Sequence, residues 1–201
     1  MPRIDYKKAA ELLHESLLTA EQLLLDRKEP PIPRDLASKL TCAGARLRTV
    51  MTENACRFVT PKSFEAVTNC PVYTSMWIAA GEFNIEHVNL TDWADIVAVV
   101  PATANTIGKM ANGICDDLLS SILCACWQKP ILIAPAMNTH MWNNPAVQRN
   151  IKILKNRGAE LIGPATGRLA CGTEGIGRLT EPQDILKRIE QIASRLNKRK
   201  R

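Results

Sequence analysis

Small and polar residues directly follow an apolar run at residues 96–100. The run is rich in β-branched side chains and does not alternate with polar ones, which is typical of a parallel strand covered on both faces. The residues that follow are Pro101, Ala102, Thr103, Ala104, Asn105 and Thr106. The alanines would let a flat ring approach the backbone, while the hydroxyl and amide groups could bind its polar edge. The segment predicts a site for a planar or anionic cofactor; the alternative is a capped strand–helix turn without a ligand.

A second segment with possible chemistry follows the apolar run at residues 131–134. The carboxyl ends of parallel strands meet at one edge of a sheet, so we expect residues 135–150 to lie on the same rim as the first segment. The Asn138 amide could donate to a substrate carboxylate without adding a charge. Met137, Met141 and Trp142 would then be apolar walls, and ordinary core packing is the alternative for them.

A histidine and a cysteine complete the set of candidate residues. His87 lies on a polar approach to the strand at 96–100, where an imidazole could act as a base, although a surface or capping role is the alternative. Cys171 lies in the glycine-rich segment 169–179, which could fold over the site as a lid. Its thiol could transfer a proton or attack as a thiolate; most free cysteines are inert small hydrophobes.

The elements that must position these residues alternate between strands and helices. Expected strands are residues 47–51, 96–100, 131–134 and 160–162. Expected helices are residues 35–43, one running from Ile107, 145–156 and 182–196, with one or two polar helices before residue 28. This alternation predicts an α/β fold with a parallel sheet and helices on both faces.

Composition excludes several classes of function. The chain has 201 residues, 46% of them hydrophobic, without a membrane-length apolar run or a secretion signal, so we expect a cytoplasmic protein that binds no membrane. Its seven cysteines lack paired CxxC spacing, which predicts reduced thiols and no metal site. The net charge of +6 is concentrated near the C-terminus, where a solvated helix end is expected, and no nucleic-acid partner is predicted.

Four motifs, in this order, resemble the flavin-dependent cysteine decarboxylase family. HVNL resembles its active-site histidine segment, PATANTIGKMANGICDDLL its flavin-contacting motif, PAMNTHMW its substrate motif and ACGTEGIGR its substrate-covering clamp. The resemblance covers roughly residues 35–182 and implies a Rossmann-like (flavodoxin-like) three-layer fold with a parallel sheet.

The resemblance also implies FMN as cofactor and a step of coenzyme A biosynthesis, the decarboxylation of 4'-phosphopantothenoylcysteine to 4'-phosphopantetheine. It implies that His87 assists oxidation and decarboxylation, Asn138 binds the carboxylate and Cys171 donates a proton. Expected substrate contacts are Asn138, Met137, Met141, Ala170 and Gly172. Expected cofactor contacts are Thr52, Phe58, Pro101, Ala102, Thr103, Ala104, Asn105 and Thr106. Members of the family form trimers or multiples of trimers, so we expect a homotrimer.

One departure from the family concerns the N-terminus. Members begin with a strand and a glycine turn that cradles the flavin phosphate, but here RKEPPIPR occupies that place, with three prolines and no glycine. We therefore expect two parts: a divergent helical segment with a proline-rich connector at 1–34, and the decarboxylase domain at 35–201. Either residues 1–34 are a divergent or mis-started terminus of a compromised protein, or replacement packing and a partner subunit complete the site.

Three other functions follow from the same resemblance. A non-catalytic regulatory or scaffold subunit of this fold is favoured by the missing phosphate turn and disfavoured by the retained His87, Asn138 and Cys171. Peptidyl-cysteine decarboxylases share the second and third motifs, PATANT and PAMN, but lack the clamp around Cys171. Flavin prenyltransferases share the fold and FMN without the PxMNxxMW segment, and rank third.

Overall fold

A computed structural model describes residues 32–77, 86–169, 172 and 174–199. By internal contacts the chain divides into two units, Met1–Pro31 and Ile32–Arg201. Only the second unit falls within the described residues. The expected helices before residue 28 lie outside them.

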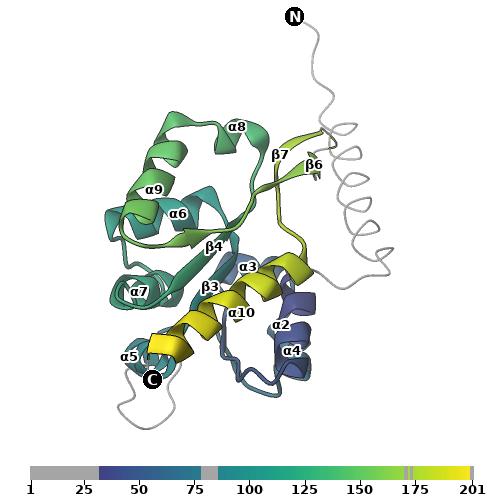
Figure 1. Cartoon of the computed structure of the whole chain (residues 1–201), viewed down its shortest axis with the longest axis vertical. Helices are drawn as coiled ribbons and strands as arrows, with labels where there is room; N and C mark the ends of the chain where they lie inside the picture. Colours follow the sequence, from purple (N-terminus) through teal and green to yellow (C-terminus); the bar gives the residue numbers. More distant parts are fainter. Residues whose placement is uncertain (1–31, 78–85, 170–171, 173, 200–201) are drawn as a thin grey trace, which may run out of the picture. The chain divides into compact units, whose positions relative to one another are not determined.

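Two parallel sheets and one antiparallel hairpin make up the strands of the described unit (Figure 1). The first sheet pairs β1 (Thr49–Val50) with β2 (Val72–Tyr73). The second has the order β3 (Val97–Ala102), β4 (Ile131–Pro135), β5 (Glu160–Leu161). The hairpin consists of β6 (Ala165–Arg168) and β7 (Glu174–Arg178). The strand expected at 47–51 is therefore reduced to two residues, and β2, β6 and β7 add strands that the hydrophobic pattern did not predict.

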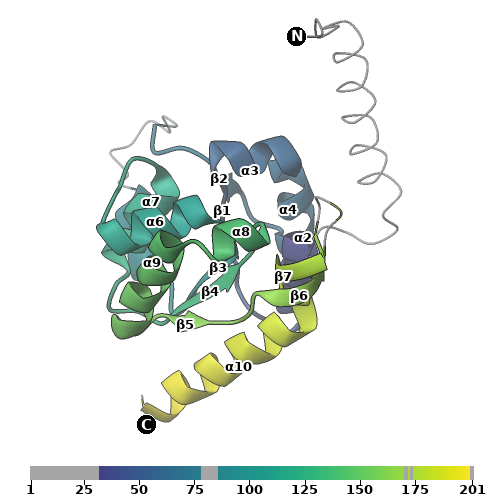
Figure 2. The same ribbon diagram turned by 90° about the horizontal axis from the view of Figure 1, so that it is seen from above.

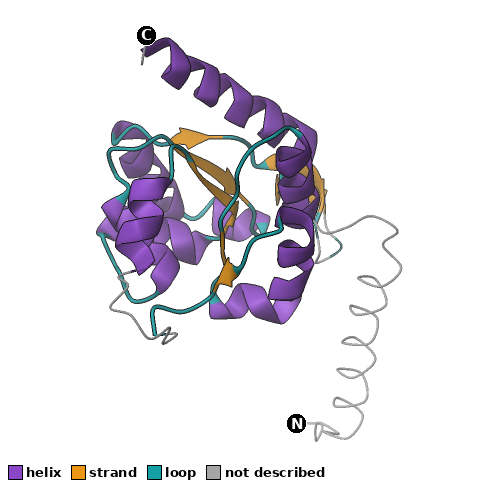
Figure 3. Ribbon diagram, turned by 90° about the horizontal axis from the view of Figure 1, so that it is seen from below, coloured by secondary structure: helices purple, strands orange, loops and turns teal. Residues whose placement is uncertain are grey.

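Helices cover both faces of the three-stranded sheet (Figures 2 and 3). They are α2 (Ile32–Cys42), α3 (Glu53–Phe58), α4 (Pro61–Thr68), α5 (Glu86–Trp93), α6 (Ala104–Asn112), α7 (Leu118–Ala125), α8 (Thr139–Trp142), α9 (Pro145–Asn156) and α10 (Pro182–Arg199). On one face, Val99 and Ile133 pack with residues of α6, α7 and α9. On the other face, Leu132 and Ala134 pack with residues of α2 and α10. The expected three-layer α/β fold with parallel strands is confirmed.

Several element boundaries differ from the sequence-based expectation. α2 begins at Ile32, not Asp35, because a proline such as Pro33 is tolerated in the first turn, where backbone N–H groups have no helical acceptor. α6 begins at Ala104, not Ile107, so three residues assigned to a polar turn form the start of the helix. Neither shift changes the position of residues 103–106 directly after the carboxyl end of β3. None of the helices within the described ranges is long and apolar enough to cross a membrane.

Candidate active site

The end of β3 delivers small and polar residues to the start of α6. Ala102 is fully buried at the last position of the strand. Thr103 caps α6, and its Oγ1 accepts a hydrogen bond from the Thr106 N–H at 3.3 Å. Asn105 and Thr103 are exposed, in the first turn, where backbone N–H groups and the helix dipole favour electron-rich ligand atoms. The carboxyl end of β3 therefore presents exposed polar side chains directly after a buried alanine.

The end of β4 lies beside this rim. Ala102 pairs with Pro135 across the sheet, and the Ala136 N–H donates to the Ala102 carbonyl at 3.1 Å. Asn138 follows and caps α8, with its Oδ1 accepting from the His140 N–H at 2.8 Å. The structure thus brings the two segments singled out in the sequence to one edge of the sheet, with the Asn138 side-chain oxygen engaged in a helix cap.

Strand β7 crosses the segment after β4. The Met137 N–H donates to the Gly177 carbonyl at 3.0 Å, and the Thr139 hydroxyl donates to the Ile176 carbonyl at 2.8 Å. A Cβ on Gly177 would lie 2.1 Å from the Met137 carbonyl oxygen, so only glycine permits this approach. The hairpin is therefore held against the segment after β4 by one backbone hydrogen bond and one hydrogen bond from the Thr139 side chain. Sequence reasoning expected a loop here; the glycines at alternating positions 175 and 177 were the available signal for close backbone packing.

The apolar side chains after β4 are divided between the core and the surface. Met137 and Trp142 are half-buried and pack against the main core cluster, which is the ordinary packing role weighed for them above. Met141 is 48% exposed, which leaves it available to a ligand or to another chain.

Two predicted cofactor contacts follow β1. Thr52 caps α3, and its Oγ1 accepts from the Ala55 N–H at 3.1 Å. Phe58, the last residue of α3, is 79% exposed. Within the described residues of this chain Phe58 therefore contributes to no enclosed site, and a ligand contact from it would need a further component.

Three of the predicted residues cannot be placed completely. Ala170 and Cys171 lie outside the described residues, and for His87 only the backbone position in α5 is described. Gly172 is exposed, and its N–H donates to the Leu169 carbonyl at 2.9 Å, which places it in the connection between β6 and β7.

A cluster of charged side chains lies at the opposite end of α6. Lys109 Nζ is 2.6 Å from an Asp116 oxygen and 2.7 Å from an Asp117 oxygen. The hydrogen bonds to both carboxylates raise the pKa of Lys109. Burial opposes the shift at Asp117, but the hydrogen bonds from Lys109 and Ser120 hold its pKa below the usual range. Asp117 also forms a capping box with Ser120 on α7, a pattern that the sequence D-x-x-S could have revealed.

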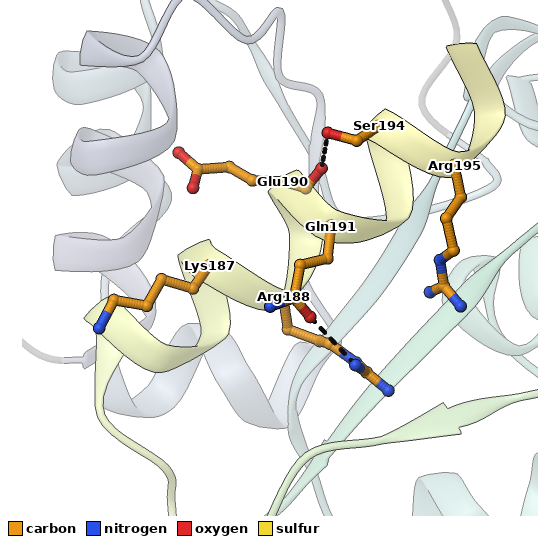
Figure 4. A pocket seen from close by; sticks show the side chains of 6 residues that line it. All are labelled: Lys187, Arg188, Glu190, Gln191, Ser194 and Arg195. Carbon is orange, nitrogen blue, oxygen red and sulfur yellow. Dashed lines mark hydrogen bonds between the residues drawn. The ribbon is translucent and has the colours of Figure 1, made fainter. Parts of the chain in front are cut away.

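A hollow on the outer surface of α10 is lined by charged and polar side chains (Figure 4): Lys187, Arg188, Glu190, Gln191, Ser194 and Arg195. Arg188 and Arg195 both pair with Glu160 of β5. Glu160 is opposite Leu132, well before the carboxyl end of β4, so the hollow does not adjoin the rim. No group of three or more potential metal ligands gathers anywhere in the described part of the chain.

Comparisons with known proteins agree with this geometry. The chain is 50% identical to the coenzyme A biosynthesis bifunctional protein CoaBC of Bacillus subtilis (strain 168) over 156 residues, which are 78% of the chain and 38% of that protein. It is 40% identical to CoaBC of Escherichia coli (strain K12) over 152 residues, 76% of the chain and 37% of that protein. The chain therefore spans less than two fifths of the length of these curated relatives.

Two solved structures resemble the described unit closely. A PPC decarboxylase mutant complexed with pantothenoylaminoethenethiol matches with a TM-score of 0.70 and 35% identity, over 80% of this chain and 89% of that one. The FMN binding protein AtHal3 matches with a TM-score of 0.66 and 34% identity, over 77% and 85% of the two chains. The Flavoprotein family model matches residues 32–194. This range begins with α2 and includes the segments after β3 and β4 as well as the β6–β7 hairpin. By this match and these identities, the chain belongs to the Flavoprotein family.

Proposed function

We propose that this protein catalyses the FMN-dependent decarboxylation of 4'-phosphopantothenoylcysteine to 4'-phosphopantetheine in coenzyme A biosynthesis. The proposal depends on one observation: the segments that follow β3 and β4 lie side by side. The Ala136 N–H donates to the Ala102 carbonyl, and β7 crosses the adjacent segment through the Met137–Gly177 hydrogen bond. CoaBC relatives and the PPC decarboxylase structure, both at more than 30% identity, support the choice of reaction.

The residues at the rim fit the ring of FMN. The small side chain of half-buried Ala104 leaves room for a flat ligand beside exposed Thr103 and Asn105, while the side chains of Thr103, Asn105 and Thr106 supply hydroxyl and amide groups for its polar edge. The phosphate has a poorer fit, because residues 28–34 contain no glycine to form a backbone nest before α2. We propose that Pro101 and Thr52 complete the contacts to the ring and that Phe58 contributes from the surface.

Within this proposal the protein positions substrate and moves protons. FMN would accept two electrons from the substrate thiol and return both after the loss of CO₂, so that the net reaction is redox-neutral. Asn138 donates an amide N–H to the substrate carboxylate while its oxygen keeps the α8 cap. Met137, Met141, Ala170 and Gly172 line the substrate, and the β6–β7 hairpin excludes water. His87 assists the oxidation and loss of CO₂, and the Cys171 thiol protonates the product.

The same proposal includes a homotrimer in the cytoplasm. Phe58 and Trp77 are 79% and 85% exposed, and large exposed aromatic side chains are enriched where protein chains meet. A contact between copies would cover them and would bring Phe58 to a shared cofactor site. The mass of the particle in solution tests this part.

A non-catalytic scaffold subunit is the second candidate, favoured by a specific observation. Residues 28–34, just before and at the start of α2, contain no glycine for a turn that would hold the flavin phosphate. A protein of this kind would keep the fold without holding flavin.

Spectroscopy and turnover of the purified full chain separate the two candidates. The decarboxylase is yellow, with about one FMN per chain, and releases CO₂ from 4'-phosphopantothenoylcysteine. His87→Asn lowers kcat by about 100-fold or more, because it removes an acid–base group. His14→Asn is the control, since His14 lies outside residues 32–194 that the family model matches, and it keeps kcat within about twofold. A colourless protein that does not take up added FMN contradicts the enzyme and supports the scaffold.

A further inference from the structure

The substrate of the proposed reaction carries two anionic groups, and only one of them reacts. Its carboxylate is lost as CO₂, whereas its phosphate carries about 1.5 to 2 negative charges at pH 7 and takes no part in the chemistry. In the proposed function Asn138 binds the carboxylate. The segments after β3 and β4, residues 101–106 and 135–144, contain no arginine or lysine. A cation that binds the phosphate therefore has to lie on another element.

The β6–β7 hairpin is the neighbouring element that carries such cations. Its strands contain two arginines, Arg168 at the end of β6 and Arg178 at the end of β7. The Arg178 guanidinium already donates to the Glu181 carboxylate. Arg168 is exposed, and its side chain forms no hydrogen bond or ion pair with any described residue. Arg168 is therefore the arginine of this hairpin whose guanidinium is available to a ligand.

The side chains around Arg168 indicate what kind of ligand it suits. Glu174 is its register partner across the hairpin, and opposite charges at such positions ordinarily attract, yet within the described residues no ion pair joins the two. Thr166 lies two residues earlier on β6 and is also exposed, and alternate residues of a strand share one face. A guanidinium and a hydroxyl group are thus presented together, and both are donors to phosphate oxygens.

The hairpin connects Arg168 to the proposed substrate contacts. Leu169 follows it directly, and the Leu169 carbonyl accepts a hydrogen bond from the N–H of Gly172 at 2.9 Å. Gly172 is one of those contacts. On the other strand, the Ile176 carbonyl accepts from the Thr139 hydroxyl at 2.8 Å, so β7 is held beside α8 (Figure 2). Arg168 therefore lies on the element that adjoins the segment proposed to bind the carboxylate.

The distances suit the length of the substrate. Thr166 pairs with Ile176, and Arg168 lies two residues further along β6. With about 5 Å between strands and a rise of about 3.4 Å per residue, the Arg168 backbone is on the order of 10 Å from the Thr139–Ile176 contact. An extended 4'-phosphopantothenoylcysteine has the length of about four residues, roughly 14 Å. A substrate whose carboxylate is at Asn138 can therefore reach the Arg168 side chain with its phosphate.

We propose that Arg168 binds the phosphate of 4'-phosphopantothenoylcysteine through two N–H groups of its guanidinium, with the Thr166 hydroxyl as a further donor, and thereby selects the phosphorylated substrate. This inference rests on the proposed decarboxylation. The planar guanidinium matches two phosphate oxygens at once, which an ammonium group does not. Because the phosphate is distant from the bond that breaks, the contact stabilises bound substrate and transition state equally and acts on KM.

Steady-state kinetics of the FMN-loaded full chain test the proposal with two substrates, 4'-phosphopantothenoylcysteine and pantothenoylcysteine, which lacks the phosphate. The parent protein should have a KM about tenfold or more lower for the phosphorylated substrate. Arg168→Gln should raise that KM by about tenfold or more, keep kcat within about threefold and leave the KM of pantothenoylcysteine unchanged. Arg168→Lys keeps the charge without the planar fork and should give an intermediate KM.

Three further variants separate phosphate binding from the overall charge of the protein. Thr166→Val removes one donor and should raise the KM of the phosphorylated substrate by a smaller factor than Arg168→Gln. Glu174→Gln removes a carboxylate that repels the phosphate and should lower this KM. Arg149→Gln is the matched control, because it removes the same charge from an exposed position on α9, and it should leave both KM values unchanged.

The outcomes distinguish the phosphate site from the reaction itself. Equal KM values of the parent for the two substrates, or an equal rise of both in Arg168→Gln, would overturn the phosphate site and leave the decarboxylase in place. Equal effects of Arg168→Gln and Arg149→Gln would reveal a general effect of charge and would overturn the site as well. A parent protein that releases CO₂ from neither substrate would overturn the proposed function, and the phosphate site with it.

Discussion

Strands β3 and β4 lie side by side with matched register, yet they have different environments. Leu132 of β4 is fully buried, whereas Ala98, its partner on β3, is exposed. Paired residues of parallel strands point to the same face, and both face the layer of α2 and α10. The difference shows that this layer covers β4 completely but leaves Ala98 open, although Val100 of the same strand packs against it. A strand with a helix on each face still needs neighbours on both edges to be buried.

The largest expected effect comes from substituting Leu132, with a substitution of its partner Ala98 as the comparison. Leu132→Ala should lower the free energy of unfolding by about 2–5 kcal/mol, because it leaves a cavity in a closed part of the core. Ala98→Ser should change it by less than about 0.5 kcal/mol, because the hydroxyl reaches solvent. Urea denaturation of both variants measures the contrast. A loss above about 1.5 kcal/mol for Ala98→Ser would mean that β3 is closed in solution.

The segments that follow β3 and β4 also differ in their contacts. After β3 the chain enters α6 directly, whereas after β4 it is held by β7 through Met137 and Gly177. Gly177→Ala should destabilise the protein by about 1–3 kcal/mol, because φ is +145° and the new Cβ would meet the Met137 carbonyl oxygen. Reduced protection of the Met137 amide in hydrogen exchange should accompany the loss.

Gly113→Ala is the matched control for this variant. Gly113 also has a positive φ, +68°, but a Cβ there would meet nothing within 4 Å. Its replacement should cost about 1 kcal/mol for backbone conformation alone and leave the Met137 amide protected. Equal effects of the two substitutions would show that the close approach of β7 to Met137 contributes nothing.

The sequence predicts the central strands well because their apolar runs are long enough to have a pattern. Residues 96–100 and 131–134 are uninterrupted apolar runs that contain several β-branched side chains, and the helix expected at 145–156 is found at Pro145–Asn156. β1 and β2 have only two residues each, which is too short for any periodicity. The hairpin was missed because glycines suggest loops, whereas Gly175 and Gly177 here allow a strand to pack against backbone.

The residues of the candidate site also differ in how far the sequence predicts their positions. Thr103, Asn105 and Asn138 follow the longest apolar runs expected to form strands, so the position of these residues at one edge of the sheet was predictable from chain order. The Lys109–Asp117 pair depends on how far the loop after Gly113 returns toward α6, which no local pattern records. The roles of His87 and Cys171 stay predictions.

The smallest expected change in stability concerns the two ends of α6. The end next to β3 carries no ion pair in the described residues, whereas the far end is held by Lys109 and Asp117. Asp117→Asn keeps an N-cap side chain for α7 and removes the charge. Because the carboxylate is about one third exposed, the loss at pH 7 should be only about 0.5–1 kcal/mol, as measured by urea denaturation.

The pH dependence of this loss identifies its cause. Folding holds the pKa of Asp117 below its ordinary value of 3.8, so the stabilisation is present above that value and disappears as the pH falls through the lowered pKa. The stabilities of Asp117→Asn and the parent protein should therefore converge once the pH has fallen below this lowered pKa. Glu53→Gln breaks an exposed pair with Arg57 and should show no measurable difference at any pH. A deficit of Asp117→Asn that persists unchanged in acid would mean that the amide weakens the α7 cap, and that the ion pair with Lys109 contributes nothing.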